Sequence, residues 1–90
     1  MDQRGTLKKA DALLASGKIG EALIHYMSVA QSYAAEGFGL KAVAVWKQVR
    51  AIAQRENQHD IAAAAGTQLA AVYRSLGLTA DAEALEKEPR

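Results

Sequence analysis

The sequence predicts an all-α chain of about five antiparallel helices, joined by tight turns into helix-turn-helix repeats that stack as an α–α solenoid. Three observations lead to this fold class. Half of the residues are apolar, many of them Ala, and the only proline is Pro89, a composition that favours helices. A turn residue recurs every twenty positions. The segments between these turn residues carry apolar side chains at helical spacing.

The recurring turn residues are Gly17, Gly37, Asn57 and Gly77, and an Ala follows each of them five positions later. Asn is the residue that best replaces Gly in the left-handed backbone conformation that ends a helix, so Asn57 completes the series. Twenty residues suit one helix of about four to five turns plus a short connection. Connections this short place successive helices antiparallel.

The predicted helices, within a single domain of residues 1–90, span residues 3–16, 19–36, 39–56, 59–76 and 79–88. Side-chain oxygens near two of the predicted starts support these boundaries. Asp60 lies where the fourth helix begins, and Thr79 precedes the fifth, with Asp81 in its first turn. Such residues are typical of helix N-terminal caps and first turns.

Each of the three long middle helices carries one apolar stripe that we expect to face the core. In 19–36 the stripe is Ile19, Ala22, Leu23, Tyr26, Val29, Ala30 and Tyr33. In 39–56 it is Ala42, Val45, Trp46, Val49, Ile52 and Ala53. In 59–76 it is Ile61, Ala65, Leu69, Val72, Tyr73 and Leu76. Small residues recur on these stripes where neighbouring helices have to approach closely.

The repeating unit is a pair of helices rather than one helix. The segment VAQSYAAEGFGLKA aligns with LAAVYRSLGLTADA, which places Tyr33 on Tyr73 and Phe38 on Leu78. The unit is therefore forty residues long; it runs from about residue 23 to 62 and begins again at 63.

These positions resemble the tetratricopeptide repeat, whose signature alternates large and small apolar residues around a Gly and an Ala. The matching residues are Tyr26, Val29, Ala30, Tyr33, Gly37, Ala42, Trp46 and Val49. The same run is also similar to repeat segments common in large bacterial scaffold proteins. The unit is longer than the family's thirty-four residues, so we expect longer helices. A three-helix hairpin of the microtubule-interacting-and-transport type shares the turn, but five evenly spaced helices argue against it.

The resemblance implies a partner-binding groove lined by the first helix of each pair, and a peptide or an amphipathic helix as its ligand. On the first such helix the groove residues would be Ile24, Met27 and Gln31, and on the second Thr67 and Arg74. The family's clamp for a C-terminal carboxylate is not visible at these positions. We therefore expect a non-enzymatic protein-interaction or scaffold module.

Self-association is the alternative that the sequence leaves open. Residues 1–55 carry eight basic and four acidic side chains, whereas residues 56–90 carry three basic and six acidic ones. Oppositely charged halves favour head-to-tail stacking or an oriented partner. The small residues between 62 and 71 point to close packing or to a face where another chain's helix docks, because an end repeat cannot bury its apolar face alone.

No catalytic, metal or cofactor site is expected. The chain has no Cys. His25 has Glu21 one turn before it, and His59 precedes Asp60, but neither has a second His at ligand spacing. No Ser has a partnered base, and no Gly-rich loop precedes a helix in the way that phosphate binding requires.

The remaining features concern nucleic acids and location. Lys41, Lys47, Arg50 and Arg55 are scattered around one helix rather than forming a stripe, so nucleic-acid binding is the least favoured reading. No apolar run is long enough to cross a membrane, and the N-terminus lacks the apolar region of a secretion signal. A cytoplasmic location is the expectation.

Overall fold

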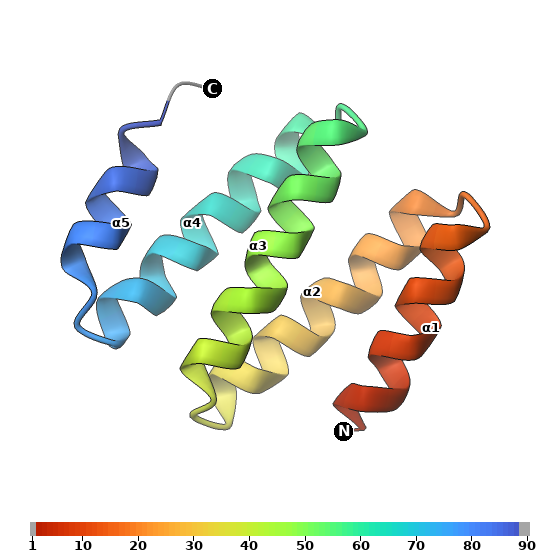
Figure 1. The fold of residues 1–90 in the computed structure, drawn as a ribbon, viewed down its shortest axis with the longest axis horizontal. Coiled ribbons are helices and arrows are strands. Elements are labelled where there is room, and N and C mark those ends of the chain that lie inside the picture. The colour runs from red at the N-terminus through yellow and green to blue at the C-terminus, as the bar shows by residue number, and fades with distance from the viewer. Residues whose placement is uncertain (1, 89–90) are drawn as a thin grey trace.

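A computed structural model describes residues 2–88, so the predicted domain of residues 1–90 includes three positions outside the described part, Met1, Pro89 and Arg90. Residues 2–88 form five α-helices and no strand, which confirms the all-helical fold class. The helices are α1 (Gln3–Ala15), α2 (Ile19–Ala35), α3 (Gly39–Arg55), α4 (His59–Ser75) and α5 (Thr79–Glu86) (Figure 1). The first four end one residue earlier than predicted, and α5 ends two residues earlier.

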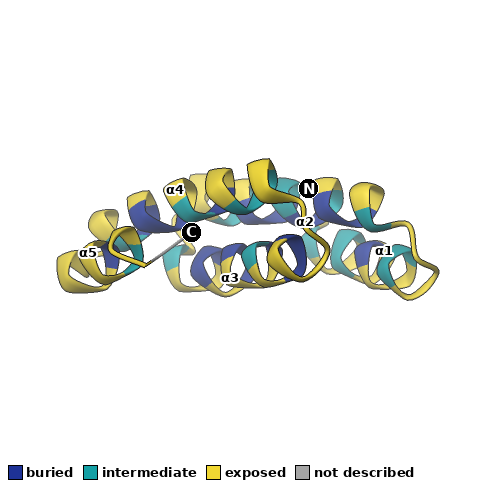
Figure 2. Ribbon diagram, turned by 90° about the horizontal axis from the view of Figure 1, so that it is seen from above, coloured by how far each residue is buried: buried dark blue, intermediate teal, exposed yellow. Residues whose placement is uncertain are grey.

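The helices form a thin slab of two layers. Seen from its edge, α2 and α4 lie in one layer, and α1, α3 and α5 lie in the other (Figure 2). The Cα positions extend over 36 × 30 × 14 Å. Each helix packs chiefly against the helices before and after it in the chain. The fold is therefore a consecutive stack, as expected for antiparallel helices joined by short turns.

All four connections between helices use the same turn. Gly17, Gly37 and Gly77 have φ between 79° and 84°, and Asn57 has φ of 59°. In each turn the residue after this position donates its N–H to the carbonyl five residues back, as from Phe38 to Tyr33 at 2.8 Å. The left-handed residue itself donates to the carbonyl three residues back. This pair of bonds is the Schellman motif, which closes a helix at a residue with positive φ.

The turns are so short that one residue ends a helix and begins the next. Phe38 follows the left-handed Gly37, and its carbonyl already accepts the first helical bond of α3, from the N–H of Ala42 at 3.0 Å. The equivalent bonds at the other turns are made by Ala22, Ala62 and Ala82. The five-residue spacing from Gly or Asn to Ala is therefore the distance from the left-handed residue that ends one helix to the residue that donates the first hydrogen bond of the next helix.

This geometry overturns the predicted side-chain caps. The cap positions of α4 and α5 are Gln58 and Leu78, and neither side chain makes a capping hydrogen bond. Asp60 lies inside the first turn of α4, and Thr79 is the first residue of α5. The described part holds one side-chain cap, at α1, where the Asp2 carboxylate accepts from the N–H of Gly5 at 3.1 Å.

The core lies between the two layers and follows the predicted stripes with one exception. Tyr26, Trp46 and Leu69 are among its largest side chains and are buried. Leu76 was predicted to be in the core, but it is 38% exposed. It is the C-terminal cap residue of α4, and its side chain lies over Gly39 at the edge of the slab. In residues 2–88, no helix has the length and hydrophobicity that a membrane span requires.

Candidate protein-interaction surfaces

The predicted groove residues lie on the outer face of α2 and α4, but they differ in accessibility. Ile24 is 62% exposed, and Gln31 and Thr67 are also exposed. Met27 is half-buried and packs against the core. The hydroxyl of Thr67 donates to the carbonyl of Ala63 at 3.2 Å, so it is engaged within its own helix. Ile24 is therefore the one large apolar side chain that this face exposes.

Arg74, the charged member of the predicted groove, pairs with α5. Its guanidinium donates two hydrogen bonds to the carboxylate of Glu86, one of them at 3.0 Å. This ion pair raises the pKa of Arg74 and lowers the pKa of Glu86. Within residues 2–88, no hydrogen bond or ion pair joins Arg74 to Gln31 or Thr67. The predicted groove residues are not linked to one another across the two helices.

A second apolar surface, which the sequence reading missed, lies along one edge of the slab. The turns between α2 and α3 and between α4 and α5 meet at this edge, the lower one in Figure 1. The four apolar side chains that these turns expose are Phe38, Leu40, Leu76 and Leu78, and we call them the apolar edge. Leu40 is 72% exposed and Phe38 47%. The four side chains of the apolar edge come from two turns that occupy equivalent positions in the repeat, forty residues apart.

The apolar edge contains a shallow hollow of about 380 Å³. It is lined by Phe38, Leu40, Leu76, Lys41 and the two glycines of the turn. Leu76 lies so close to Gly39 that a Cβ there would stand 2.6 Å from its Cδ2 atom. The Lys41 ammonium lies 5.0 Å from the centre of the Phe38 ring. Lys41 is thus the only charged group in the lining.

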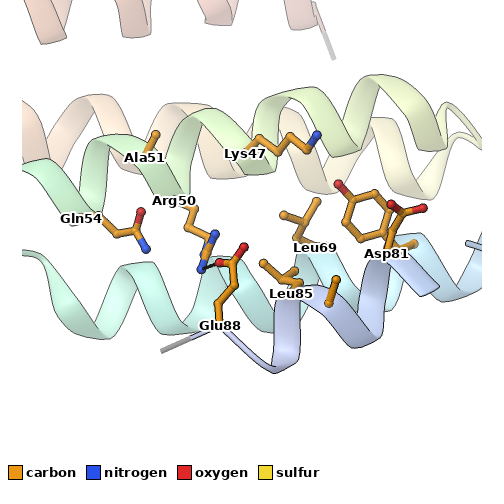
Figure 3. A pocket seen from close by; sticks show the side chains of 10 residues that line it. Lys47, Arg50, Ala51, Gln54, Leu69, Asp81, Leu85 and Glu88 are labelled. Atoms are coloured by element: carbon orange, nitrogen blue, oxygen red, sulfur yellow. Dashed lines mark hydrogen bonds and ion pairs between the residues drawn. The ribbon is translucent and has the colours of Figure 1, made fainter. Parts of the chain in front are cut away.

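A second cavity, of about 350 Å³ and more enclosed, lies between α3 and α5, with α4 contributing to its lining (Figure 3). Its α3 wall is cationic, because Lys47 and Arg50 line it. Its other wall is acidic, with Asp81 from α5 and Glu88 from the residues just after it. The remaining lining side chains are apolar groups, one amide and one phenol: Ala51, Leu69, Ala84, Leu85, Gln54 and Tyr73.

One ion pair crosses this cavity. The guanidinium of Arg50 donates to the carboxylate of Glu88 (Figure 3). The Arg50 side chain is only 22% exposed, because it lies against α4 at Gly66. A Cβ at position 66 would stand 3.7 Å from the Arg50 Nε atom. The small residues of α4 noted in the sequence therefore leave room for an α3 side chain.

A polar contact between α1 and α2 lies on the other side of α3. The Tyr26 ring is fully buried, and its hydroxyl donates to the carboxylate of Asp11. Burial and the neighbouring Asp11 carboxylate raise the pKa of Tyr26 to about 12. Gln48 of α3 also lies close to this hydroxyl and lowers the pKa slightly. The tyrosine thus fills the space between α1 and α3.

The two histidines lie apart from these surfaces. The Nδ1 atom of His25 lies 2.8 Å from the carbonyl of Glu21, one turn earlier in the same helix. His59 is exposed at the start of α4. In the described part of the chain, no group of three or more His, Cys, Asp or Glu side chains is arranged to hold a metal ion.

Comparisons of the chain with protein-family models, with curated proteins and with solved structures find no match.

Proposed function

We propose that this chain is a non-enzymatic protein-interaction module of the tetratricopeptide-like kind, which binds an amphipathic helix of a partner protein at its apolar edge. The observation that carries the proposal is the exposure of large apolar side chains at one place. Four of the five large apolar residues exposed in residues 2–88 belong to the apolar edge. Contiguous apolar patches on a small protein mark interaction sites more often than scattered exposed residues do.

The chemistry of the edge indicates what it would bind. Phe38 and Leu40 flank the hollow at one turn, and Leu76 closes it from the other. An apolar side chain of a partner helix fits such a hollow, since interface anchors are apolar groups placed in pockets. The lining charge is the Lys41 ammonium. A partner with an acidic side chain beside its apolar anchor is therefore favoured.

The face of α2 and α4 is the second place where a partner helix could bind, as the family resemblance implies. It exposes Ile24, but Met27 is half-buried and Arg74 is paired with Glu86. These side chains offer less accessible apolar surface than the apolar edge does. The edge is therefore the surface that we favour.

Site-specific photo-cross-linking in the native cell tests the proposal. One variant carries a benzophenone amino acid at Leu40, and the control carries it at Ala63, which is exposed on α4 away from the edge. The expected result is a discrete protein adduct from position 40 that position 63 does not form. Equal adducts from both positions, or adducts from position 63 alone, would contradict the proposal.

Self-association is the alternative, and the distribution of charge favours it. The basic residues Arg4, Lys8 and Lys9 are exposed on α1, and the acidic residues Asp81 and Glu83 are exposed on α5. These helices are the two ends of the slab (Figure 1), so copies could stack head to tail. Sedimentation equilibrium over a range of concentrations, at low and high salt, distinguishes self-association from a monomeric state. A monomer under all conditions would exclude self-association, whereas a salt-sensitive increase in mass would support it.

A further inference from the structure

The apolar edge is built from two turns that lie next to each other and are equivalent in the repeat. The turn between α2 and α3 precedes the turn between α4 and α5 by forty residues. The side chain of Leu76, in the second turn, lies over Gly39, in the first. The two turns are therefore neighbours along the edge (Figure 1), and their side chains can be compared position by position.

The side chains of the two turns differ in size. Leu40, at the start of α3, is 72% exposed, and its counterpart at the start of α5 is Ala80, which is also exposed. Phe38 and Leu78 form a second pair of counterparts, and both are exposed. The turn between α2 and α3 thus carries the larger member of each pair, and the turn between α4 and α5 carries the smaller one.

The charges of the two turns are opposite. Lys41 lines the hollow of the apolar edge, and its counterpart is Asp81, in the first turn of α5. Both side chains are exposed. Within residues 2–88, neither of them forms an ion pair. The apolar edge therefore has a large, basic half and a small, acidic half.

Such an edge is complementary to itself. In a two-fold dimer the same surface of both copies forms the contact. A two-fold axis through the thickness of the slab reverses the order of the turns along the edge and keeps α3 and α5 in the same layer (Figure 2). Leu40 of each copy then faces the small Ala80 of the other. Lys41 of each copy faces Asp81 of the other, so size and charge match twice over.

We propose that the partner bound at the apolar edge is a second copy of this chain, packed edge to edge about this axis. The inference rests on the proposed function, because it uses the same surface, and it names the partner. The helix that brings the apolar anchor is α3 of the second copy, and the anchor is Leu40. The arrangement differs from a head-to-tail stack of α1 on α5, because a two-fold contact closes at two copies.

Sedimentation equilibrium of the full chain tests the closed dimer. We expect a monomer–dimer equilibrium whose mass stops at twice 9.6 kDa. The dissociation constant should lie between about 10 µM and 1 mM, since a contact of a few side chains is weak. A monomer throughout this range would overturn the inference. Masses that continue to rise above the dimer would also overturn it, because they indicate open stacking.

Two charge reversals test which turns meet. Lys41→Asp and Asp81→Lys each place like charges opposite one another, so each variant alone should weaken the dimer about threefold or more. An equimolar mixture of the two variants should dimerise as strongly as the native chain, because each copy supplies the charge that the other lacks. Lys8→Asp, at an exposed position of α1, is the control and should change nothing. A mixture that stays as weak as the single variants, or an equal loss for Lys8→Asp, would overturn the inference.

The cross-link at position 40 separates failure of this inference from failure of the proposed function. We expect its main adduct in the cell to consist of two copies of this chain. An adduct with a different protein, and none with a second copy, would overturn the inference while supporting the proposed function. The absence of any adduct at position 40 would contradict both.

Discussion

Asn57 holds a φ of 59° at the one turn where the repeat has no glycine. A residue with a Cβ enters this region at a cost of about 1–2 kcal/mol, and Asn tolerates it better than most. The three glycines at the other turns avoid this cost, because they carry no side chain. At the residue scale, each turn therefore depends on a residue that tolerates positive φ at one of these four positions.

Replacing two glycines of different backbone conformation should change stability in opposite directions. Gly37→Ala is expected to lower the free energy of unfolding by about 1–2 kcal/mol. Its φ is 84°, and no neighbouring atom would contact the new methyl group, so the effect is one of the backbone. Gly20 lies in α2, where a new methyl group would also meet no neighbouring atom. Gly20→Ala should therefore raise the free energy of unfolding by about 0.5–1 kcal/mol. Urea unfolding measures both, and changes of the same sign would contradict this account.

The raised pKa of Tyr26 predicts that the contribution of this side chain to the stability of the fold decreases at alkaline pH. Its folded-state pKa is raised to about 12 by burial and by Asp11, above the unfolded value of about 10. The folded state then holds the proton more tightly, so its stabilising effect is complete below about pH 10 and is lost as pH rises toward 12. The advantage of the native protein over Tyr26→Phe in urea unfolding should therefore shrink between these values. An advantage that is constant or grows with pH would contradict the assignment.

At the scale of the element, the helices differ in how much of their surface is covered. α3 packs between α2 and α4, and seven of its residues are buried. α5 packs against α4, and Ala82 is its one buried residue. The Arg74–Glu86 and Arg50–Glu88 ion pairs also hold the C-terminal segment. An exposed pair such as Arg74–Glu86 contributes little to stability, so α5 depends largely on a small apolar contact.

Amide hydrogen exchange should follow this difference. Local opening requires less free energy where fewer apolar contacts are broken. The amides of α5 are therefore expected to exchange fastest among the five helices, and the central amides of α3 slowest. Measurement by NMR on the intact chain checks the order. Protection in α5 equal to that in α3 would show that a stronger contact holds the last helix.

Much of the element structure could be predicted, because its causes are local in the chain. The left-handed turns follow from Gly and Asn at fixed spacing, and the stripes follow from helical periodicity. The prediction that Leu76 is in the core was wrong, because an apolar stripe does not show where a helix extends beyond the helices packed against it. The pairing of Arg74 with Glu86 joins two helices across a turn. Its geometry depends on how α5 lies against α4, which periodicity does not specify.

At the scale of the molecule, the slab is two helices thick and has two broad faces and narrow edges (Figure 2). Antiparallel helices bring alternate turns to the same edge, so Phe38 and Leu76 meet although they belong to different repeats. Neither the apolar edge nor the cavity between α3 and α5 could be predicted before the order and register of the helices were known.

The measurement that tests the central claim most directly is the affinity of the chain for the partner cross-linked at position 40. Leu40→Glu places a charge on the apolar edge, and Ala63→Glu places the same charge on an exposed part of α4. Both side chains are exposed, so neither change disturbs the core. We expect Leu40→Glu to weaken binding at least tenfold, a loss of about 1.4 kcal/mol or more, and Ala63→Glu to leave it unchanged. An unchanged affinity for Leu40→Glu, or an equal loss for Ala63→Glu, would contradict the claim that the apolar edge binds the partner.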